Sequence, residues 1–307
     1  MRDGGSISFV SDSVNNILIK LRFFNLLGNA ATIASTVQHM HHYGFSEGEH
    51  KVSFGWLNLK EARDKYILRL NSIYENSMES NGIISIIGTA SFPDKKTLRE
   101  GDAMKKVHVT NEINNEKTTY LAKHVLIATG ARPIFPEGDG IFENSLSSDG
   151  FFELNELPKK VVIVGAGYIG VELAGILQAL GTDTSLVIRK KNILSRFDEI
   201  IYGTLEQEMT KQGIKIYKET GGVHSITKSE QGEKSVLLKN GLSISGVDCV
   251  IMATGRGPNI ERLNLSGAGI QQQESGHIQV NEYSETSVDG IYALGDVCGK
   301  VELTPMV

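Results

Sequence analysis

The stretch of sequence that decides the fold reads Lys-Lys-Val-Val-Ile-Val-Gly-Ala-Gly-Tyr-Ile-Gly-Val-Glu-Leu and runs from residue 159 to residue 173. Its β-branched run, Val161–Val164, is typical of a strand that is buried on both faces in a parallel sheet. Gly165, Gly167 and Gly170 follow in the spacing G-x-G-x-x-G, and helix-forming residues then continue to Gly181. The stretch therefore predicts a strand, a glycine turn and a helix in direct succession.

Each glycine of this spacing has a physical role in a turn that binds a dinucleotide. The first permits the tight turn, the second lets the backbone approach a pyrophosphate, and the third allows the helix to pack closely on the strand. The N-terminus of the helix offers amide groups to the phosphates. An ordinary glycine turn of an α/β protein is the alternative, and the order of the three parts favours the dinucleotide site.

The end of the next strand, predicted over Ser185–Ile188, indicates which dinucleotide binds. A site for NAD places an acidic residue there, about twenty residues after the glycines, to accept from the ribose hydroxyls. This chain has Arg189, Lys190 and Lys191 instead, and Arg196 follows closely. Such cations pair with the additional phosphate of NADPH, so the sequence predicts NADPH. A solvated basic loop is the alternative.

The composition excludes several classes of protein. With 307 residues, the chain is long enough for two domains or for one domain with an insertion. Its net charge of −5 argues against nucleic-acid binding. Two cysteines, Cys249 and Cys298, are too few for a disulfide scaffold, and we interpret both as thiols that pack in the core. No apolar run is long enough to span a bilayer, so we expect no membrane association. We expect a cytoplasmic protein, with the mitochondrion as the alternative compartment.

The remaining patterns predict alternating helices and strands. The expected elements are helices over 30–45, 58–81 and 199–211, with Asp198 as the cap of the last, and strands over 83–87, 106–110, 118–121, 125–128, 214–217, 224–228, 235–238 and 247–253. His39, His41 and His42 cluster at a helix end, but no cysteine or carboxylate converges on them, so we expect no metal site. Tyr66 and Tyr74 stand two helical turns apart, which puts both hydroxyls on one side of the helix.

Three strand ends carry features of nucleotide sites. The sequence Ala-Thr-Gly occurs at 128–130 and again at 253–255, which suggests two similar strand ends where the chain passes between domains. A third strand, within 286–296, leads to Gly295 and Asp296. There the glycine permits close approach of the backbone, and the aspartate can accept from the hydroxyls of a ribityl chain.

Taken as a set, these motifs resemble those of the flavoprotein disulfide reductases with two dinucleotide-binding domains, and among them the enzymes that reduce glutathione disulfide. The resemblance runs from about residue 30 to the C-terminus. It rests on Arg63-Asp64 through Tyr74, Ile127–Gly130, Ser148–Phe152, Val164–Glu172, Ala253–Arg256, Gly295–Lys300 and Leu303–Pro305.

The resemblance implies an α/β fold with two Rossmann-like, three-layer domains, in which an NADPH domain is inserted into an incomplete FAD domain. The implied boundaries are 29–157 for part of the FAD domain, 158–289 for the NADPH domain and 290–307 for the return to the FAD domain, with 1–28 unassigned. We expect the C-terminal dimerisation domain of the family to be absent, and the homodimer of the family to be doubtful for this chain.

The resemblance also assigns roles to residues. The NADPH set is Gly165, Gly167, Tyr168, Gly170, Glu172, Arg189, Lys190, Arg196, Gly255 and Arg256. The FAD set is Thr89, Ala90, Thr129, Gly130, Ser148, Asp149, Gly295, Asp296 and Thr304. Tyr168 would gate the nicotinamide pocket, Tyr66 and Tyr74 would face glutathione disulfide, and Glu172 would pair with a lysine beside the redox dithiol.

The chain also departs from the family pattern. The Cys-x4-Cys dithiol is expected at about 16–21, where the sequence reads Asn-Ile-Leu-Ile-Lys-Leu. Also missing are the first FAD glycine fingerprint and the lysine partner of Glu172. Ser195 occupies the position where the second phosphate-binding arginine is expected, and Arg196 follows one residue later. By family, hydride passes from NADPH to FAD, then to a disulfide and to oxidised glutathione. We expect this chain not to complete that reaction, because a thiolate next to a resolving thiol is required.

Two other functions stay open on the sequence. One is a non-catalytic module that binds NADPH, and the other is a flavin-dependent NADPH oxidoreductase that needs no dithiol. A truncated or mis-joined gene product is a further interpretation of residues 1–28. Loss of the first FAD strand would expose sheet edges, which favours aggregation.

Overall fold

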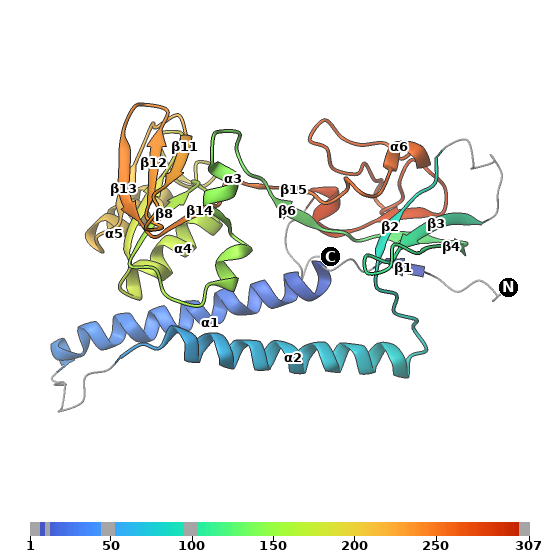
Figure 1. The fold of residues 1–307 in the computed structure, drawn as a ribbon, viewed down its shortest axis with the longest axis horizontal. Coiled ribbons are helices and arrows are strands. Elements are labelled where there is room, and N and C mark those ends of the chain that lie inside the picture. The colour runs from blue at the N-terminus through green and yellow to red at the C-terminus, as the bar shows by residue number, and fades with distance from the viewer. Residues whose placement is uncertain (1–6, 10–12, 44–52, 95–103, 301–307) are drawn as a thin grey trace. The chain divides into compact units, whose positions relative to one another are not determined.

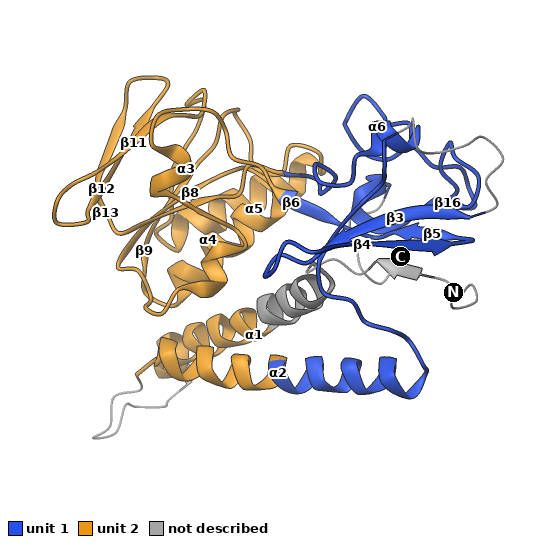
Figure 2. Ribbon diagram, turned by 45° about the vertical axis from the view of Figure 1, so that its right-hand side comes forward, with its two compact units in different colours: residues 1–19, 68–132, 256–307 blue, residues 20–67, 133–255 orange. Residues whose placement is uncertain are grey.

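A computed structural model of the chain describes residues 7–9, 13–43, 53–94 and 104–300, and describes side chains from residue 26 onward. The chain forms two compact units (Figure 2). Unit 1 comprises 1–19, 68–132 and 256–307, and unit 2 comprises 20–67 and 133–255.

Unit 2 is built on a five-stranded parallel sheet in the order β10-β9-β8-β14-β7. Figure 1 labels its neighbouring strands β8 and β14. Every neighbouring pair in this sheet runs parallel. The strands are β7 (Leu146–Ser147), β8 (Lys160–Val164), β9 (Asp183–Val187), β10 (Lys215–Tyr217) and β14 (Cys249–Met252). The β-branched run of the deciding stretch therefore forms the central strand, which is where burial on both faces is required.

Alternate residues of β8 face two different cores. Val161 and Ile163 pack in a cluster with Leu173 and Leu177 of α4 (Tyr168–Ala179), whereas Val162 and Val164 pack against the strands of a second sheet. That second sheet is antiparallel, in the order β11-β12-β13. Its strands are β11 (Val223–Lys228), β12 (Lys234–Leu238) and β13 (Ser243–Val247). Unit 2 is thus three-layered, with helices on one face of the parallel sheet and strands on the other.

Unit 1 holds a three-stranded parallel sheet, β1-β5-β16, and a three-stranded antiparallel sheet, β2-β3-β4. The strands are β1 (Ile7–Phe9), β5 (Val125–Ile127), β16 (Ile291–Ala293), β2 (Thr89–Ser91), β3 (Lys105–Thr110) and β4 (Lys117–Ala122). A two-stranded pair, β6 (Ala131–Pro133) with β15 (Arg256–Pro258), lies where the chain passes from one unit to the other. The apolar core of this unit includes Val107, Ile127 and Leu263.

The remaining elements are helices and short turns. They are α1 (Ser13–His39), η1 (Met40–Tyr43), α2 (Trp56–Ser80), α3 (Ile141–Asn144), η3 (Gly150–Glu153), α5 (Glu199–Lys211), α6 (Leu265–Ala268) and η4 (Gly295–Cys298). Within the described ranges, none of the helices combines the length and the apolar character needed to cross a bilayer.

The α/β class and most predicted elements are confirmed. The helix at 199–211 has the predicted bounds, and the side chain of Asp198 accepts from the amide of Ile200 at its N-terminus. The predicted strand at 83–87 is wrong, because this segment pairs with no strand and Ile84 and Ile87 are 70% and 85% exposed. At the N-terminus, β1 pairs with β5 in parallel register at the edge of its sheet, and no glycine fingerprint follows it in the sequence.

The compact units change at 132/133 and 255/256, whereas the sequence suggested changes at 157/158 and 289/290. Core packing explains the difference. Phe151 and Phe152 belong to the same buried cluster as α4 in unit 2, so the segment before 158 packs with the later strands. Leu265 and Ile278 pack in the core of unit 1 together with β5, so the segment before 290 already belongs there.

Candidate functional site

The glycine turn after β8 is fixed by direct backbone contacts. Gly165 has φ +143°, and a Cβ at this position would lie 2.1 Å from the carbonyl oxygen of Ala253. A Cβ at Gly170 would lie 2.7 Å from the carbonyl oxygen of Gly165. Both positions therefore require glycine, the first for the turn and the second for the close approach of α4 to the turn.

Gly167 differs from these two glycines because the space around it is open. It has an ordinary φ of −83°, it caps the N-terminus of α4, and a Cβ there would meet no atom within 4 Å. Among the residues that the structure describes, no contact therefore requires glycine at this position. The open space lies beside the first amides of a helix, where an anion is favoured. The turn fits the pyrophosphate of a dinucleotide.

The predicted cations follow β9 at the same edge of the sheet as the glycine turn, because β8 and β9 run parallel. Arg189, Lys190 and Arg196 are all exposed, so a bound phosphate can reach them. Their backbone is held in place, because the amide of Leu194 donates to the carbonyl of Ala166 in the glycine turn (2.8 Å). This hydrogen bond couples the basic loop to the turn that would hold the pyrophosphate.

Tyr168 and Glu172 stand one helical turn apart on α4, directly after the glycines. Tyr168 is 48% exposed, so its ring is accessible as a gate would need to be. The carboxylate of Glu172 reaches solvent, yet neighbouring protein atoms remove part of its hydration and raise its pKa. Among the described side chains, no ion pair is formed by Glu172. Gly255, which directly precedes β15 and has φ +125°, also belongs to this unit.

Part of the predicted FAD set gathers in unit 1 around an open cavity of about 400 Å³. The cavity is lined by Thr89, Ala90, Glu112, Thr129, Arg132, Asn259, Glu261, Arg262 and Leu263. Three of the residues that the sequence assigns to FAD therefore share one cavity. Its charged residues are paired with each other, Arg132 with Glu261 and Arg262 with Glu112.

Thr89 is tied into this charged rim. Its hydroxyl donates to Glu112 at 2.6 Å, and Arg262 lies 2.6 Å from the same carboxylate. The hydrogen bond from Thr89, followed by the charge of Arg262, lowers the pKa of Glu112. The sequence reading missed Glu112 and Arg262, since they are far apart in the chain and belong to no motif.

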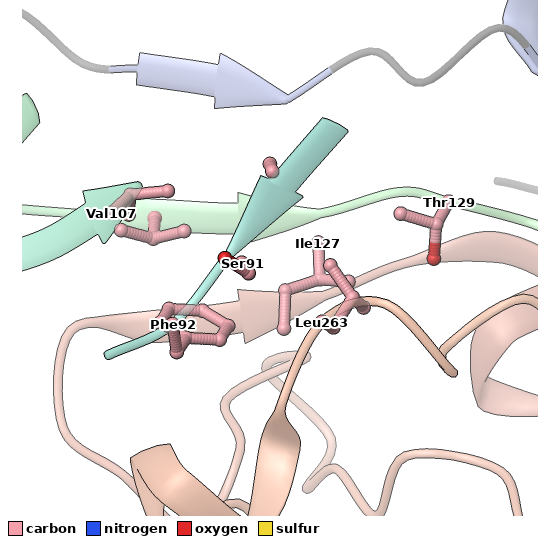
Figure 3. A pocket seen from close by; sticks show the side chains of 8 residues that line it. Ser91, Phe92, Val107, Ile127, Thr129 and Leu263 are labelled. Atoms are coloured by element: carbon pink, nitrogen blue, oxygen red, sulfur yellow. The ribbon is translucent and has the colours of Figure 1, made fainter. Parts of the chain in front are cut away.

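A second, closed cavity lies beside the first and holds only about 10 Å³ (Figure 3). Its walls are mostly apolar and include Phe92, Val107 and Ile127. Ala90, Thr129 and Leu263 line both cavities. A space of this size corresponds to about one water molecule. It is a packing defect of the core and has no room for a ligand.

Asp296 lies in η4, directly after Gly295, which has φ +82°. Burial raises the pKa of Asp296, and the nearby charges of Arg256 and His277 partly oppose that rise. The guanidinium of Arg256 donates to the carbonyl of Ala131 at 2.5 Å. The predicted FAD residue Asp296 and the predicted NADPH residue Arg256 are thus close enough in unit 1 to influence each other electrostatically.

Other predicted residues are placed separately. Ser148 and Asp149 belong to unit 2, where Ser148 is buried just before η3. Tyr66 and Tyr74 both lie on α2 and are 42% and 40% exposed. Gly130, with φ +67°, follows β5 in unit 1. Thr304 lies outside the described residues.

Both cysteines are unsuited to redox exchange. Cys249 and Cys298 are 4% and 3% exposed and belong to different compact units. Burial raises the pKa of each thiol to about 11, so neither forms the reactive thiolate at neutral pH. Their predicted role as packing thiols is confirmed by their places in the cores of the two units.

Comparisons with known proteins show the family of the chain. The profile of the pyridine nucleotide-disulphide oxidoreductase family matches residues 29–306. The chain is 40% identical over 285 residues to glutathione reductase of Yarrowia lipolytica, which covers 92% of this chain and 59% of that protein. The chain therefore spans about three fifths of the length of this curated relative.

Solved structures support the same fold. The Cu(II) complex of the HOCl-induced flavoprotein disulfide reductase RclA from Escherichia coli matches with a TM-score of 0.76 at 24% identity, over 92% of this chain and 57% of that one. LpdA from Mycobacterium tuberculosis matches with a TM-score of 0.76 at 24% identity, over 91% of this chain and 58% of that one.

Proposed function

Because the chain belongs to the pyridine nucleotide-disulphide oxidoreductase family, we propose that it binds NADPH at the turn after β8 and FAD in unit 1. The overall reaction that we propose for the whole protein is the reduction of glutathione disulfide by NADPH. The observation that carries the proposal is the pairing of a glycine turn that is open at Gly167 with a basic loop after β9. No acidic residue stands at that strand end to favour NAD.

The residues of unit 2 would divide the work of binding NADPH. Gly165 and Gly170 shape the turn, and the amides at the start of α4 would donate to the pyrophosphate. Arg189 and Lys190 would hold the ribose phosphate, with Arg196 close by, because a guanidinium can pair with phosphate through two parallel hydrogen bonds. Tyr168 would cover the nicotinamide pocket, and its side chain is accessible to a ligand from solvent, at 48% exposure.

The residues of unit 1 would hold the flavin, which when bound accepts hydride from NADPH and passes electrons to a disulfide. Thr89 and Ala90 would face the adenosine part, and Asp296 would accept from ribityl hydroxyls. Arg256 keeps a positive charge beside Asp296. Tyr66 and Tyr74, exposed on α2, would face glutathione disulfide.

We also propose that this chain by itself does not reduce glutathione disulfide. Its two cysteines are buried, their pKa values are raised to about 11, and they lie in different compact units. These observations favour a second candidate function, a module that binds NADPH without completing a disulfide reaction. A flavin-dependent NADPH oxidoreductase that uses no dithiol is the corresponding catalytic alternative.

Calorimetric titration of the purified chain with NADP⁺ and NAD⁺ tests the cofactor proposal. We expect NADP⁺ to bind at least tenfold more tightly, and Arg189→Ala to reduce that ratio by roughly tenfold, since a charge-assisted hydrogen bond contributes about 1.5–3 kcal/mol. Lys228→Ala, which removes an exposed cation at the end of β11, is the matched control and should leave the ratio unchanged. Equal binding of the two nucleotides would refute the proposed NADPH preference.

Three further measurements separate the candidate functions. Visible flavin absorbance of the purified chain supports the FAD proposal, whereas NADPH binding without flavin supports the non-catalytic module. Turnover of glutathione disulfide with NADPH and added FAD would contradict the proposed inactivity. Oxidation of NADPH by a quinone acceptor, without such turnover, would support the dithiol-independent oxidoreductase.

A further inference from the structure

Thr220 is a fully buried polar residue in the segment between β10 and β11, at 0% exposure. Its hydroxyl donates to the carbonyl of Ile188 at 2.9 Å and accepts from the amide of Gly222 at 3.1 Å. Its own amide donates to the same carbonyl at 3.3 Å. The side chain of Thr220 therefore bridges two backbone segments inside unit 2.

The first of these segments leads directly into the basic loop. Ile188 immediately precedes Arg189, and its amide donates to the carbonyl of Tyr217 at 2.9 Å. One residue beyond Arg189, the carbonyl of Lys190 accepts from the amide of Glu219 at 3.1 Å. The backbone on both sides of Arg189 is thus held by the segment that contains Thr220.

The second segment lies under the Arg189 side chain. A Cβ built at Gly222 would lie 3.4 Å from Cγ and 3.6 Å from Cδ of Arg189, so the aliphatic stem of the arginine runs over this glycine. Gly222 has φ +106°, a backbone conformation that residues other than glycine rarely adopt. The hydroxyl of Thr220 holds the amide of this same glycine.

We propose that Thr220 is a positioning residue that sets the specificity of the site for the ribose 2′-phosphate, without touching the cofactor. One hydroxyl fixes both the strand end that carries Arg189 and the glycine on which its stem lies. The inference rests on the proposed preference for NADPH. Its physical basis is that a guanidinium pairs with a phosphate through two parallel hydrogen bonds, so a small rotation of Arg189 costs most of that interaction.

Removing the hydroxyl has a predictable local effect. In Thr220→Val the amide of Gly222 loses its acceptor and the carbonyl of Ile188 keeps only one donor. A buried amide without a partner is unfavourable, so the segment shifts until water or another group reaches it. Arg189 then loses its fixed placement, whereas the close contacts of Gly165 and Gly170 in the glycine turn, with the carbonyls of Ala253 and Gly165, do not involve this segment.

Two small ligands separate recognition of the 2′-phosphate from binding of the rest of the nucleotide. Adenosine 2′,5′-bisphosphate carries the 2′-phosphate, and AMP carries the same adenosine and 5′-phosphate without it. Their affinities for the full chain are measured by calorimetry, and the ratio of the two reports recognition of the 2′-phosphate alone. We expect Thr220→Val to lower this ratio by roughly tenfold with AMP binding unchanged, and Thr220→Ser to restore it, because serine keeps the hydroxyl.

Thr182→Val is the matched control. Thr182 is also buried, at 1% exposure, and its hydroxyl also donates to a backbone carbonyl, that of Pro158 at 2.8 Å. It precedes β9 at the end opposite to Arg189. We expect this variant to lose stability but to keep the ratio of the two ligand affinities. A change of this ratio in Thr220→Val alone therefore cannot be ascribed to a general loss of stability.

The outcomes distinguish this inference from the proposed function. A wild-type chain that binds both ligands equally overturns the NADPH preference and, with it, the role of Thr220. A wild-type chain that discriminates, together with a Thr220→Val variant that discriminates equally well, overturns only the role of Thr220. If Thr220→Val no longer binds AMP, Thr220→Ala is compared with Thr220→Ser, and an equal ratio in these two refutes the inference.

Discussion

Replacing Gly165 by alanine should destabilise unit 2 severely. The backbone there has φ +143°, and an L-residue in such a conformation costs roughly 1–3 kcal/mol. The added Cβ would also stand 2.1 Å from the carbonyl oxygen of Ala253, and relief of such an overlap costs about another 1–3 kcal/mol. The sum, roughly 2–6 kcal/mol, is a large part of the 5–15 kcal/mol that typically stabilises a domain.

Trp56 makes this loss measurable. It is the single tryptophan of the chain, and it lies in the core of unit 2. Its ring centroid lies 5.8 Å from that of Phe151, and its indole N–H donates to the carbonyl of Leu154. Its fluorescence during urea unfolding therefore reports unit 2, to which Gly165 belongs. We expect a clear fall of the urea midpoint in Gly165→Ala.

Gly167→Ala provides the contrast. Its φ is ordinary and no atom of the described residues lies within 4 Å of the added Cβ, so the free energy of unfolding should stay within about 0.5 kcal/mol of the wild type. Dinucleotide binding should nevertheless weaken, because the new methyl group stands where a pyrophosphate would approach the backbone. A Gly165→Ala chain as stable as the wild type would refute this account of the turn, and so would an equal loss in both variants.

Two substitutions and the behaviour of the two thiols test other parts of the fold. Asp198→Ala removes the cap of α5 and should cost about 1 kcal/mol in urea unfolding, whereas an asparagine there should cost almost nothing. Arg63→Met removes a buried guanidinium that donates to a main-chain carbonyl, and should cost about 1.5–3 kcal/mol, while the exposed Arg69 tolerates the same change. Cys249 and Cys298 should resist a thiol reagent at pH 8 until the chain unfolds. Because burial raises their pKa to about 11 and exposed thiols of the unfolded chain ionise from about 9, stability should fall as pH rises through that window.

The central strand, the glycine turn and the helix cap could be predicted because each depends on residues that are neighbours in the chain. Val161–Val164 is buried on both faces as its composition implies, and Asp198 caps the helix that begins one residue later. The segment 83–87 has an equally strand-like composition and forms no strand. A strand needs a pairing partner from elsewhere in the chain, and local composition says nothing of that partner.

The same limit applies to the candidate site. The basic residues after β9 could be found by counting from the glycines, since the spacing of a β-α-β unit is regular. Thr220 could not, because its role depends on hydrogen bonds to Ile188 and Gly222 that only the folded chain brings together. The pairing of Glu112 with Arg262 likewise joins residues that are 150 positions apart.

The central position of β8 also determines how slowly its backbone exchanges hydrogen with the solvent. The strand lies between β9 and β14, and Val161, Val162 and Ile163 have no exposed surface, so their amide protons exchange only when unit 2 opens as a whole. A dinucleotide at one hundred times its Kd stabilises the folded unit by about 2.7 kcal/mol, which slows that opening roughly a hundredfold. Deuterium uptake of this strand, which would touch the ligand only at its end, would thus measure cofactor binding from inside the sheet.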